Sequence, residues 1–316
     1  MSEDLHIGLA LGGGGAAALS AIGVIQELAA AGIPVHCVAG TSAGAIVGAA
    51  FASGHLNELS EAMSSLTRSR FYKLFDPTWK RGGLMDGRRG MDLVTPFFGE
   101  TIEALPMRFA AVATDLDTGE EVVLDNGPTA DAVRASIAIP GVFRPQTTHG
   151  RVLVDGGLVN PIPVSVARAM GADYVIAASI LRIGSFIEEF TNDLFDAGTD
   201  VAEAADAACA PPTDAANPSV QLGVLDVLAK GSAVVQSHIA EARLRVDPPD
   251  AFIAPRSEHI GVFELLRGAE AIECGREAAR RAVPAILESI AAARQRREAG
   301  PLRRLISSTL ARRRAI

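Results

Sequence analysis

The sequence predicts an α/β fold of three layers, with helices covering both faces of a mostly parallel central sheet. Short apolar runs, such as Ile7 to Leu11 and Val35 to Ala39, have the length and composition of buried strands. Each of these runs leads into a glycine-containing turn and then into a stretch with helical spacing of apolar residues. The chain has 316 residues, of which 48% are hydrophobic, so it is long enough to bury a large core.

Composition argues against several functional classes. A formal net charge of −8 argues against general binding to nucleic acid. The three cysteines, Cys37, Cys209 and Cys274, are far apart and show no paired metal-ligand spacing. We therefore expect no disulfide framework, no metal site and no cofactor, and the cysteine pattern favours a reducing, cytoplasmic compartment.

The N-terminal segment from Ile7 to Ile25 has no charged residue and is long enough to span a bilayer. Its middle contains four glycines, Gly12 to Gly15, which would weaken a spanning helix, and acidic residues precede it where a signal peptide needs positive charge. We expect instead a strand at Ile7 to Leu11, a glycine loop, and a helix from about Ala18 to Ala31.

A Gly-x-Ser-x-Gly motif, Gly40-Thr41-Ser42-Ala43-Gly44, follows the second predicted strand. Glycines on both sides of Ser42 permit a sharp strand-to-helix turn, because they let neighbouring backbone approach closely. Such a turn exposes the hydroxyl at the edge of a sheet and directs the first helical amides toward it. Ser42 is therefore the candidate nucleophile, and Gly40 and Gly44 are the glycines of the nucleophile elbow.

The glycine loop has two interpretations. Gly12-x-Gly14-x-x-Ala17 fits a loose dinucleotide-binding fingerprint, but that fold needs an acidic residue near the end of the next strand. Here the next strand ends in the serine motif instead. An oxyanion hole is the better explanation, in which the backbone amides of Gly13, Gly14 or Gly15 face the Ser42 hydroxyl.

The middle of the chain continues the α/β pattern. A helix is predicted from Leu56 to Leu66, and strands from Met107 to Thr114 and from Glu121 to Leu124. Aromatic and apolar residues between Phe71 and Trp79 indicate a packed loop or small helical cap, and the lining of an acyl-chain groove is the alternative.

A second motif, Asp155-Gly156-Gly157, follows a strand from Arg151 to Asp155. By itself Asp-Gly is common turn chemistry, and a hairpin or crossover turn would explain it. A serine nucleophile also requires a base, and a carboxylate at a strand end can reach the sheet edge that bears Ser42. The rival base is a histidine, and only His238 or His259 could complete the chain order serine, aspartate, histidine.

These motifs resemble the three signatures of patatin-like phospholipases of the bacterial branch, in the family order. The resemblance covers about residues 5–179 and resumes at about 226–279. It includes the supporting stretches Ala113-Thr114-Asp115-Leu116 and Arg134 to Phe143. It implies a three-layer patatin-like fold and a Ser-Asp dyad without histidine or metal, in which Ser42 attacks an acyl ester and Asp155 takes and returns the proton. The glycine loop would stabilise the oxyanion, and family substrates are phospholipids, lysophospholipids and other acyl esters.

The sequence departs from that family at three positions. Ala17 and Ala18 stand where the family usually has Arg or Lys and then Gly, and Ala21 stands where many bacterial members have His. The basic residue is thought to fix the oxyanion loop, so we expect low hydrolytic turnover. Two alternatives stay open: a catalytically weak protein that binds lipid or acyl groups as a regulator, or alanines that hold the loop by extending the following helix.

The C-terminal half contains two segments of unusual charge within what we expect to be a single domain over residues 1–316. An acidic insertion at about 183–218 is interpreted as a solvated loop or as a mobile flap. Helices are then predicted from Leu222 to Ala242 and from Leu265 toward Arg297, bent near Pro284, with a strand at Ala251 to Ala254 between them.

A basic tail occupies about residues 294–316, with eight arginines against Glu298 alone. Leu302, Leu305, Ile306 and Leu310 recur within it at helical spacing, which is typical of an interfacial helix attracted to anionic lipid. The tail therefore predicts peripheral contact with an anionic membrane. A solvated, frayed terminus explains it equally well.

Overall fold

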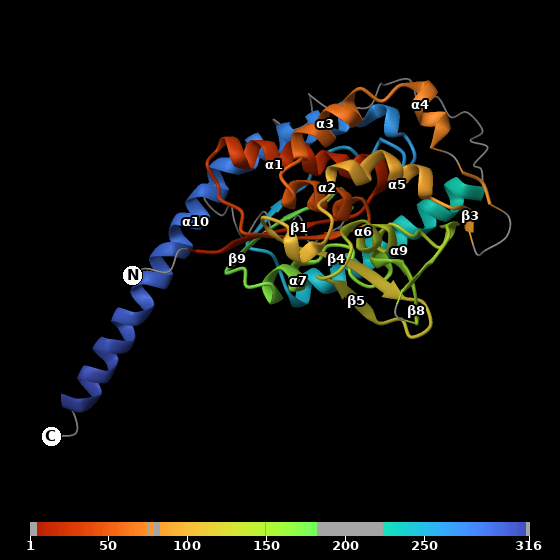
Figure 1. Ribbon diagram of the computed structural model, residues 1–316. Coiled ribbons are helices and arrows are strands. Elements are labelled where there is room, and N and C mark those ends of the chain that lie inside the picture. Colours follow the sequence, from red (N-terminus) through yellow and green to blue (C-terminus); the bar gives the residue numbers. More distant parts are fainter. Residues whose placement is uncertain (1–4, 75, 79–82, 149, 182–223, 314–316) are drawn as a thin grey trace.

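The computed structural model describes residues 5–74, 76–78, 83–148, 150–181 and 224–313, and for 224–226, 229 and 298–313 it describes the backbone alone. The predicted acidic insertion at 183–218 lies outside these residues. The chain forms an α/β fold with a central sheet between two layers of helices (Figure 1). The predicted three-layer architecture is confirmed.

Within the described residues, the central sheet has eight strands. Its hydrogen-bonded path is β10-β9-β1-β2-β4-β8-β7, and β5 also pairs with β4. The strands are β1 (Ile7–Leu11), β2 (Cys37–Thr41), β4 (Arg108–Asp115), β5 (Glu121–Leu124), β7 (Gln146–Thr148), β8 (Arg151–Asp155), β9 (Tyr174–Ala178) and β10 (Ala251–Ile253). The five strands from β10 to β4 are parallel, whereas β5, β7 and β8 enter through antiparallel pairs.

The pairing of β4 determines where the site forms. Residues Ala111 to Thr114 pair with β5, and this range overlaps both the residues that pair with β2 and those that pair with β8. Because a strand has only two edges, β2 and β8 must share the edge opposite β5. Thr41 at the end of β2 pairs with Val112, and Asp155 at the end of β8 pairs with the next residue, Ala113. The two strands therefore meet end to end.

Helices cover both faces of the sheet (Figure 1). One face carries α1 (Ser20–Ala30), α2 (Ala43–Ala52), α3 (Leu56–Ser64) and α10 (Gly268–Arg313), and the other carries α7 (Val164–Ala169) and α9 (Val224–Val246). Along β1 the side chains alternate between the two faces of the sheet. Leu9 and Leu11 join the apolar core under α1, α2 and α10, and Ala10 joins the apolar core under α7 and α9.

Shorter elements complete the described chain. They are η1 (Gly15–Leu19), α4 (Arg68–Lys73), β3 (Gly83–Met85), α5 (Arg88–Val94), η2 (Thr95–Phe97), η3 (Ile102–Ala104), α6 (Thr129–Ser136), β6 (Gly141–Phe143), η4 (Gly156–Leu158) and η5 (Leu265–Arg267). β3 and β6 form a separate parallel pair.

Most predicted elements are present, with shifted ends. β1 and β5 have their predicted bounds, whereas β2 begins and ends two residues later than predicted. Of the aromatic segment, Phe71 and Tyr72 lie in α4, a small helix as one of the two predicted alternatives has it, whereas Phe75 and Trp79 lie outside the described residues. None of the residues of α4 is buried and Tyr72 is 71% exposed, so the small helix, and not the packed loop, describes α4.

The apolar N-terminal segment is divided into β1, η1 and α1, as predicted. No helix in the described ranges is long and apolar enough to cross a membrane.

A close crossing of α1 and α10 joins the two ends of the chain. A Cβ atom at Gly23 would overlap the carbonyl oxygen of Ile272, and a Cβ atom at Gly275 would overlap the carbonyl oxygen of Ser20. The obstructing atoms are backbone, which a rotamer change cannot move. The two helices can therefore approach this closely only because each has a glycine at the crossing.

We expect Gly23→Ala to destabilise the fold by about 2 kcal/mol, because the added methyl group forces the two helices apart. Gly231→Ala is the matched control, since Gly231 is also helical but has no atom within 4 Å of its Cβ position. That change should be neutral or stabilise by up to about 1 kcal/mol. Urea unfolding measures both, and equal stability of the two variants would contradict the proposed crossing constraint.

Candidate active site

Ser42 lies in a strained turn between β2 and α2. Its φ of 55° and ψ of −127° make it the only non-glycine residue with positive φ in the part of the chain that the structure describes. Such a conformation costs about 1–3 kcal/mol and is common at functional sites. A Cβ atom at Gly40 would lie 2.5 Å from the carbonyl oxygen of Gly44, and one at Gly44 would overlap that of Leu11. Both elbow glycines are therefore sterically required.

Hydrogen bonds hold this turn in place. The Ser42 amide donates to Oγ of Ser136 at 2.8 Å, and that hydroxyl donates to the carbonyl of Val112 at 2.6 Å. Ser136 is fully buried at the end of α6, so it connects the elbow to β4. Sequence reasoning assigned it no role, and the only signal was its place in a stretch that supported the family resemblance.

Asp155 faces Ser42 across the junction of β8 and β2. The Ser42 hydroxyl donates to Oδ2 of Asp155 at 2.6 Å, and the amide of Gly157 donates to Oδ1 at 2.7 Å. The backbone of Asp155 is fixed as well, since its amide donates to the Ala138 carbonyl and its carbonyl accepts from the Thr114 hydroxyl. Both carboxylate oxygens therefore have defined partners, and the partner of Oδ2 is the candidate nucleophile, Ser42.

The environment of Asp155 alters its acidity. Burial raises the pKa of this carboxyl from 3.8 to about 6, and the hydrogen bonds from Ser42 and Gly157 oppose part of that rise. At neutral pH the group is still ionised, yet it is a better proton acceptor than an ordinary aspartate. A pKa near the working pH suits a general base.

The glycine loop lies beside the serine. A Cβ atom at Gly13 would be 3.1 Å from Cβ of Ser42, and Gly13 donates its amide to the Pro161 carbonyl over a long 3.4 Å. Gly14 and Gly15 have positive φ values of 136° and 60°. Within the described residues their amides make no hydrogen bond. The loop therefore presents N–H donors next to Ser42 that a developing negative charge could use.

The two alanines that replace the family's basic residue and glycine lie in η1. Ala17 is 1% and Ala18 is 3% exposed. The alanines do continue into the next helix, since η1 runs directly into α1. The expectation of low turnover stays a prediction.

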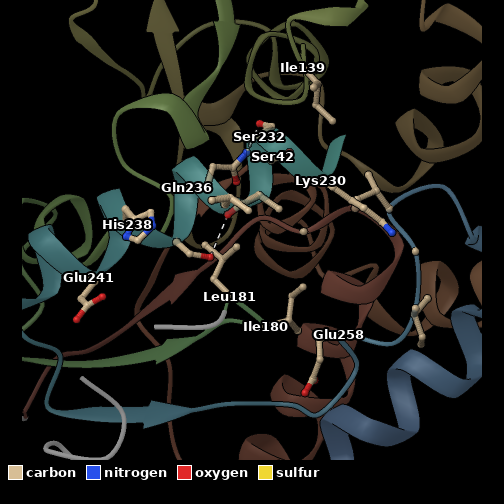
Figure 2. A pocket seen from close by; sticks show the side chains of 18 residues that line it. Ser42, Ile139, Ile180, Leu181, Lys230, Ser232, Gln236, His238, Glu241 and Glu258 are labelled. Carbon is tan, nitrogen blue, oxygen red and sulfur yellow. Dashed lines mark hydrogen bonds between the residues drawn. The ribbon is translucent and has the colours of Figure 1, made fainter. Parts of the chain in front are cut away.

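A pocket of about 470 Å³ opens at Ser42 (Figure 2). Its volume lies within the range of small-molecule sites, roughly 300–1,000 Å³. Gly14 and Gly15 line it together with apolar side chains that include Ile139, Ile180 and Ile260. Polar residues of α9 also line the pocket. They are Lys230, Ser232, Gln236, Ser237, His238 and Glu241.

The rival histidine bases lie elsewhere in the structure. His238 lines the pocket, whereas the His259 ring is hydrogen-bonded to Glu270 at 2.8 Å on the surface. In the described part of the chain, neither ring is hydrogen-bonded to Ser42 or Asp155. Among those same residues, no group of three or more His, Cys, Asp or Glu side chains could hold a metal ion.

The structure therefore brings together the residues that the motifs singled out: Ser42, Asp155 and the loop of Gly13, Gly14 and Gly15, with Gly40 and Gly44 at the elbow. Apart from His238, the polar pocket residues of α9 were not predicted from the sequence, and among them Gln236 lies against the glycine motifs. Its amide group packs against Gly157 and lies close to Gly13. A glutamine within a long helical pattern gives no sequence signal of such a position.

A nearly buried serine on a strand-to-helix turn, hydrogen-bonded to a buried aspartate beside a glycine loop, resembles the nucleophile elbow of α/β serine hydrolases. The profile of the patatin-like phospholipase family matches residues 9–168 of this chain. The chain belongs to the patatin-like phospholipase family. This membership supports lipid hydrolase activity at the level of the family.

Individual relatives agree with this assignment. The chain is 41% identical over 180 residues to an uncharacterized NTE family protein of Mycobacterium tuberculosis (strain ATCC 25618 / H37Rv), covering 57% of this chain and 50% of that protein. It is 33% identical over 185 residues to patatin-like phospholipase domain-containing protein 7 of Rattus norvegicus, covering 55% of this chain and 13% of that protein. The chain thus spans at most about half the length of these relatives.

Among solved structures, VipD from Legionella pneumophila aligns with a TM-score of 0.45 and 16% sequence identity, covering 61% of this chain and 53% of that chain.

We expect the difference in free energy of unfolding between Asp155→Asn and the unaltered protein to favour the variant more at pH 7.5 than at pH 4. The raised pKa means that the folded state holds the proton more tightly than the unfolded state, so stability falls as pH rises from about 4 through about 6. The pKa shift corresponds to about 3 kcal/mol of stability, which the unaltered protein loses when Asp155 ionises. The asparagine variant does not ionise and so does not lose it. Urea unfolding of both proteins at the two pH values measures this. A stability difference independent of pH would contradict the raised pKa.

Proposed function

We propose that the protein is a serine acyl hydrolase acting on lipid esters, of the phospholipase A or lysophospholipase type. The observation that carries the proposal is the 2.6 Å hydrogen bond from the Ser42 hydroxyl to the buried Asp155 carboxylate, at a pocket of about 470 Å³. Apolar side chains such as Ile139 and Ile180 line part of this pocket and suit an acyl chain.

In the proposed reaction Ser42 and Asp155 act as a dyad. Asp155 accepts the hydroxyl proton while Oγ of Ser42 attacks the ester carbonyl and forms a tetrahedral intermediate. When the intermediate collapses, the bond to the leaving alcohol breaks and Asp155 returns the proton to that alcohol. Water then attacks the acyl-serine by the same route, which releases the fatty acid and restores Ser42.

The glycine loop supplies the proposed oxyanion hole. Gly14 and Gly15 line the same pocket as Ser42, and their amides are without hydrogen bonds to the rest of the described chain. The first amides of α2 point from the same turn and add the positive end of the helix dipole. Donors fixed before the charge develops contribute most to rate, about 3–4 kcal/mol for one well-placed group.

A catalytically weak protein that binds lipid or acyl groups as a regulator is the second candidate. The observation in its favour is Ala17, which offers no basic side chain to the oxyanion loop. The two candidates differ in whether Ser42 reacts.

We expect a fluorophosphonate probe to label Ser42 and short acyl esters to be hydrolysed by the unaltered protein. Ser42→Ala should abolish both without unfolding, because it removes the only proposed nucleophile. Mass spectrometry of the labelled peptide and an ester assay measure these outcomes, with circular dichroism as the folding control. Folded Ser42→Ala protein with full activity would contradict the enzyme assignment, and unlabelled Ser42 in the unaltered protein would favour the regulator.

We expect the base to be Asp155 alone. Asp155→Asn should lower kcat at least about a thousandfold, whereas His238→Ala and His259→Ala keep most of the activity. Because only the ionised carboxylate accepts a proton, the rate should fall tenfold per pH unit below about pH 6. A histidine variant as impaired as Asp155→Asn would replace the dyad by a triad.

We also propose that the basic tail attaches the protein to anionic membrane surfaces. The backbone of α10 is helical as far as Arg313, through the residues whose spacing suits an interfacial helix. In Figure 1 the C-terminal part of α10 extends away from the rest of the described molecule. A helix in that position has its faces available to a lipid surface.

We expect removal of residues 298–316 to weaken sedimentation with vesicles that contain anionic lipid, and to make the remaining binding less sensitive to salt. This deletion spares Arg297, which pairs with Asp173 on the body of the protein. Vesicles of neutral lipid are the control. Unchanged binding to anionic vesicles at low salt would show that the tail does not attach the protein to membranes.

A further inference from the structure

The segment between β10 and η5 lies against the glycine loop. Ser257 in this segment is fully buried, and its hydroxyl donates to the carbonyl of Ala17 at 3.0 Å, across 240 residues of sequence. The accepting carbonyl belongs to η1, the turn that continues the glycine run. A buried hydroxyl thus anchors the C-terminal side of the loop.

A second contact anchors the loop one residue earlier. The amide of Ala16 donates to the carbonyl of Val262 at 2.9 Å, and a Cβ atom at Gly15 would overlap that same carbonyl oxygen. Val262 and its neighbours Ile260 and Gly261 also line the pocket. We call residues 257–262 the clamp segment, because they contact the glycine loop and form a wall of the pocket.

The clamp segment is itself held by its neighbours. The Arg267 guanidinium donates to the carbonyl of His259 at 3.2 Å, and the His259 ring is bonded to Glu270 in the first turn of α10. The amide of Gly261 donates to the Glu264 carboxylate at 2.8 Å. The segment is therefore fixed on the side away from the loop.

The glycine loop needs such an anchor. Glycines lose more backbone entropy on ordering than other residues, so a run of four does not fix its own amides toward an oxyanion. Position 17 offers no hydrogen-bonding side chain, and Ala17 is buried. The Ala17 carbonyl accepts from the Ser20 amide within its own turn, and the Ser257 hydroxyl adds a second donor from another part of the chain.

We propose that Ser257 is a positioning residue, which together with the Val262 carbonyl holds the oxyanion loop in place of the basic side chain absent at position 17. The proposal rests on the proposed function, since an oxyanion loop has meaning only in an acyl hydrolase. Ser257 touches the loop and not the substrate, so its effect is on the rate of the chemical step.

The test is Ser257→Ala, which removes one oxygen and leaves the packing in place. We expect kcat for a short acyl ester to fall roughly tenfold with KM changed less than twofold, and fluorophosphonate labelling of Ser42 to slow by a similar factor. Amide exchange in the peptide spanning Gly12 to Ala17 should become faster, which reports on the loop without any activity.

Ser53→Ala is the matched control. Its hydroxyl oxygen also lies within hydrogen-bond distance, 2.7 Å, of the backbone carbonyl oxygens of Ala49 and Phe97, at the other end of α2. It should leave kcat, labelling and exchange of the glycine loop unchanged. Ser257→Cys keeps the shape with a weaker donor and should show a smaller loss in the same direction. It serves as the test if the alanine variant does not fold.

The outcomes separate this proposal from the proposed function. Normal kcat and normal loop exchange in Ser257→Ala would overturn the positioning role while the hydrolase assignment stands. Equal losses in Ser257→Ala and Ser53→Ala would reduce Ser257 to general stability and also overturn it. If the unaltered protein neither hydrolyses esters nor reacts with the probe, the hydrolase assignment fails first, and unchanged exchange in Ser257→Ala would then show that Ser257 does not hold the loop.

Discussion

Two strands share one edge of β4, and the candidate site exists because their ends meet there. β2 arrives parallel and ends at Thr41 opposite Val112, and β8 arrives antiparallel and ends at Asp155 opposite Ala113. Each strand end must then leave the edge, so the next backbone turns sharply on both sides. This constraint puts the hydroxyl of Ser42 within 2.6 Å of a carboxylate that comes from more than a hundred residues later in the chain.

The arrangement is costly for the fold, and its surroundings offset the cost. Ser42 has a strained backbone, and Asp155 is 1% exposed with a charge at neutral pH. Ser136, Gly157 and Thr114 supply hydrogen bonds to these two residues. This junction is therefore less stable than an apolar one would be, and it holds a hydroxyl against a carboxylate.

The sequence predicted the local elements of the site well and its long-range supports poorly. β1 and the glycine motifs could be predicted because strand length, apolar runs and steric requirements of turns act over a few residues. The direction of β8 could not, since Asp155-Gly156 is equally compatible with a parallel or an antiparallel approach. The strand β9 was not predicted, although Gly171 with positive φ and Asp173 mark a turn just before it. Ser136 and Ser257 are ordinary serines in sequence, and only the fold brings their hydroxyls to the elbow and to the glycine loop.

The crossing of α1 with α10 has a consequence for synthesis of the chain. β1 lies inside the sheet between β2 and β9, and the first helix packs against residues near Gly275. The glycine loop is thus made well before Ser257, which lies 240 residues after Ala17, and its contacts can be completed only when that serine has left the ribosome. At typical translation rates of about 5–20 residues per second, that interval is roughly 10–50 s. Until residues 174–178 have been made and form β9, one edge of the apolar strand Ile7 to Leu11 is unpaired, which exposes the nascent chain to aberrant strand pairing.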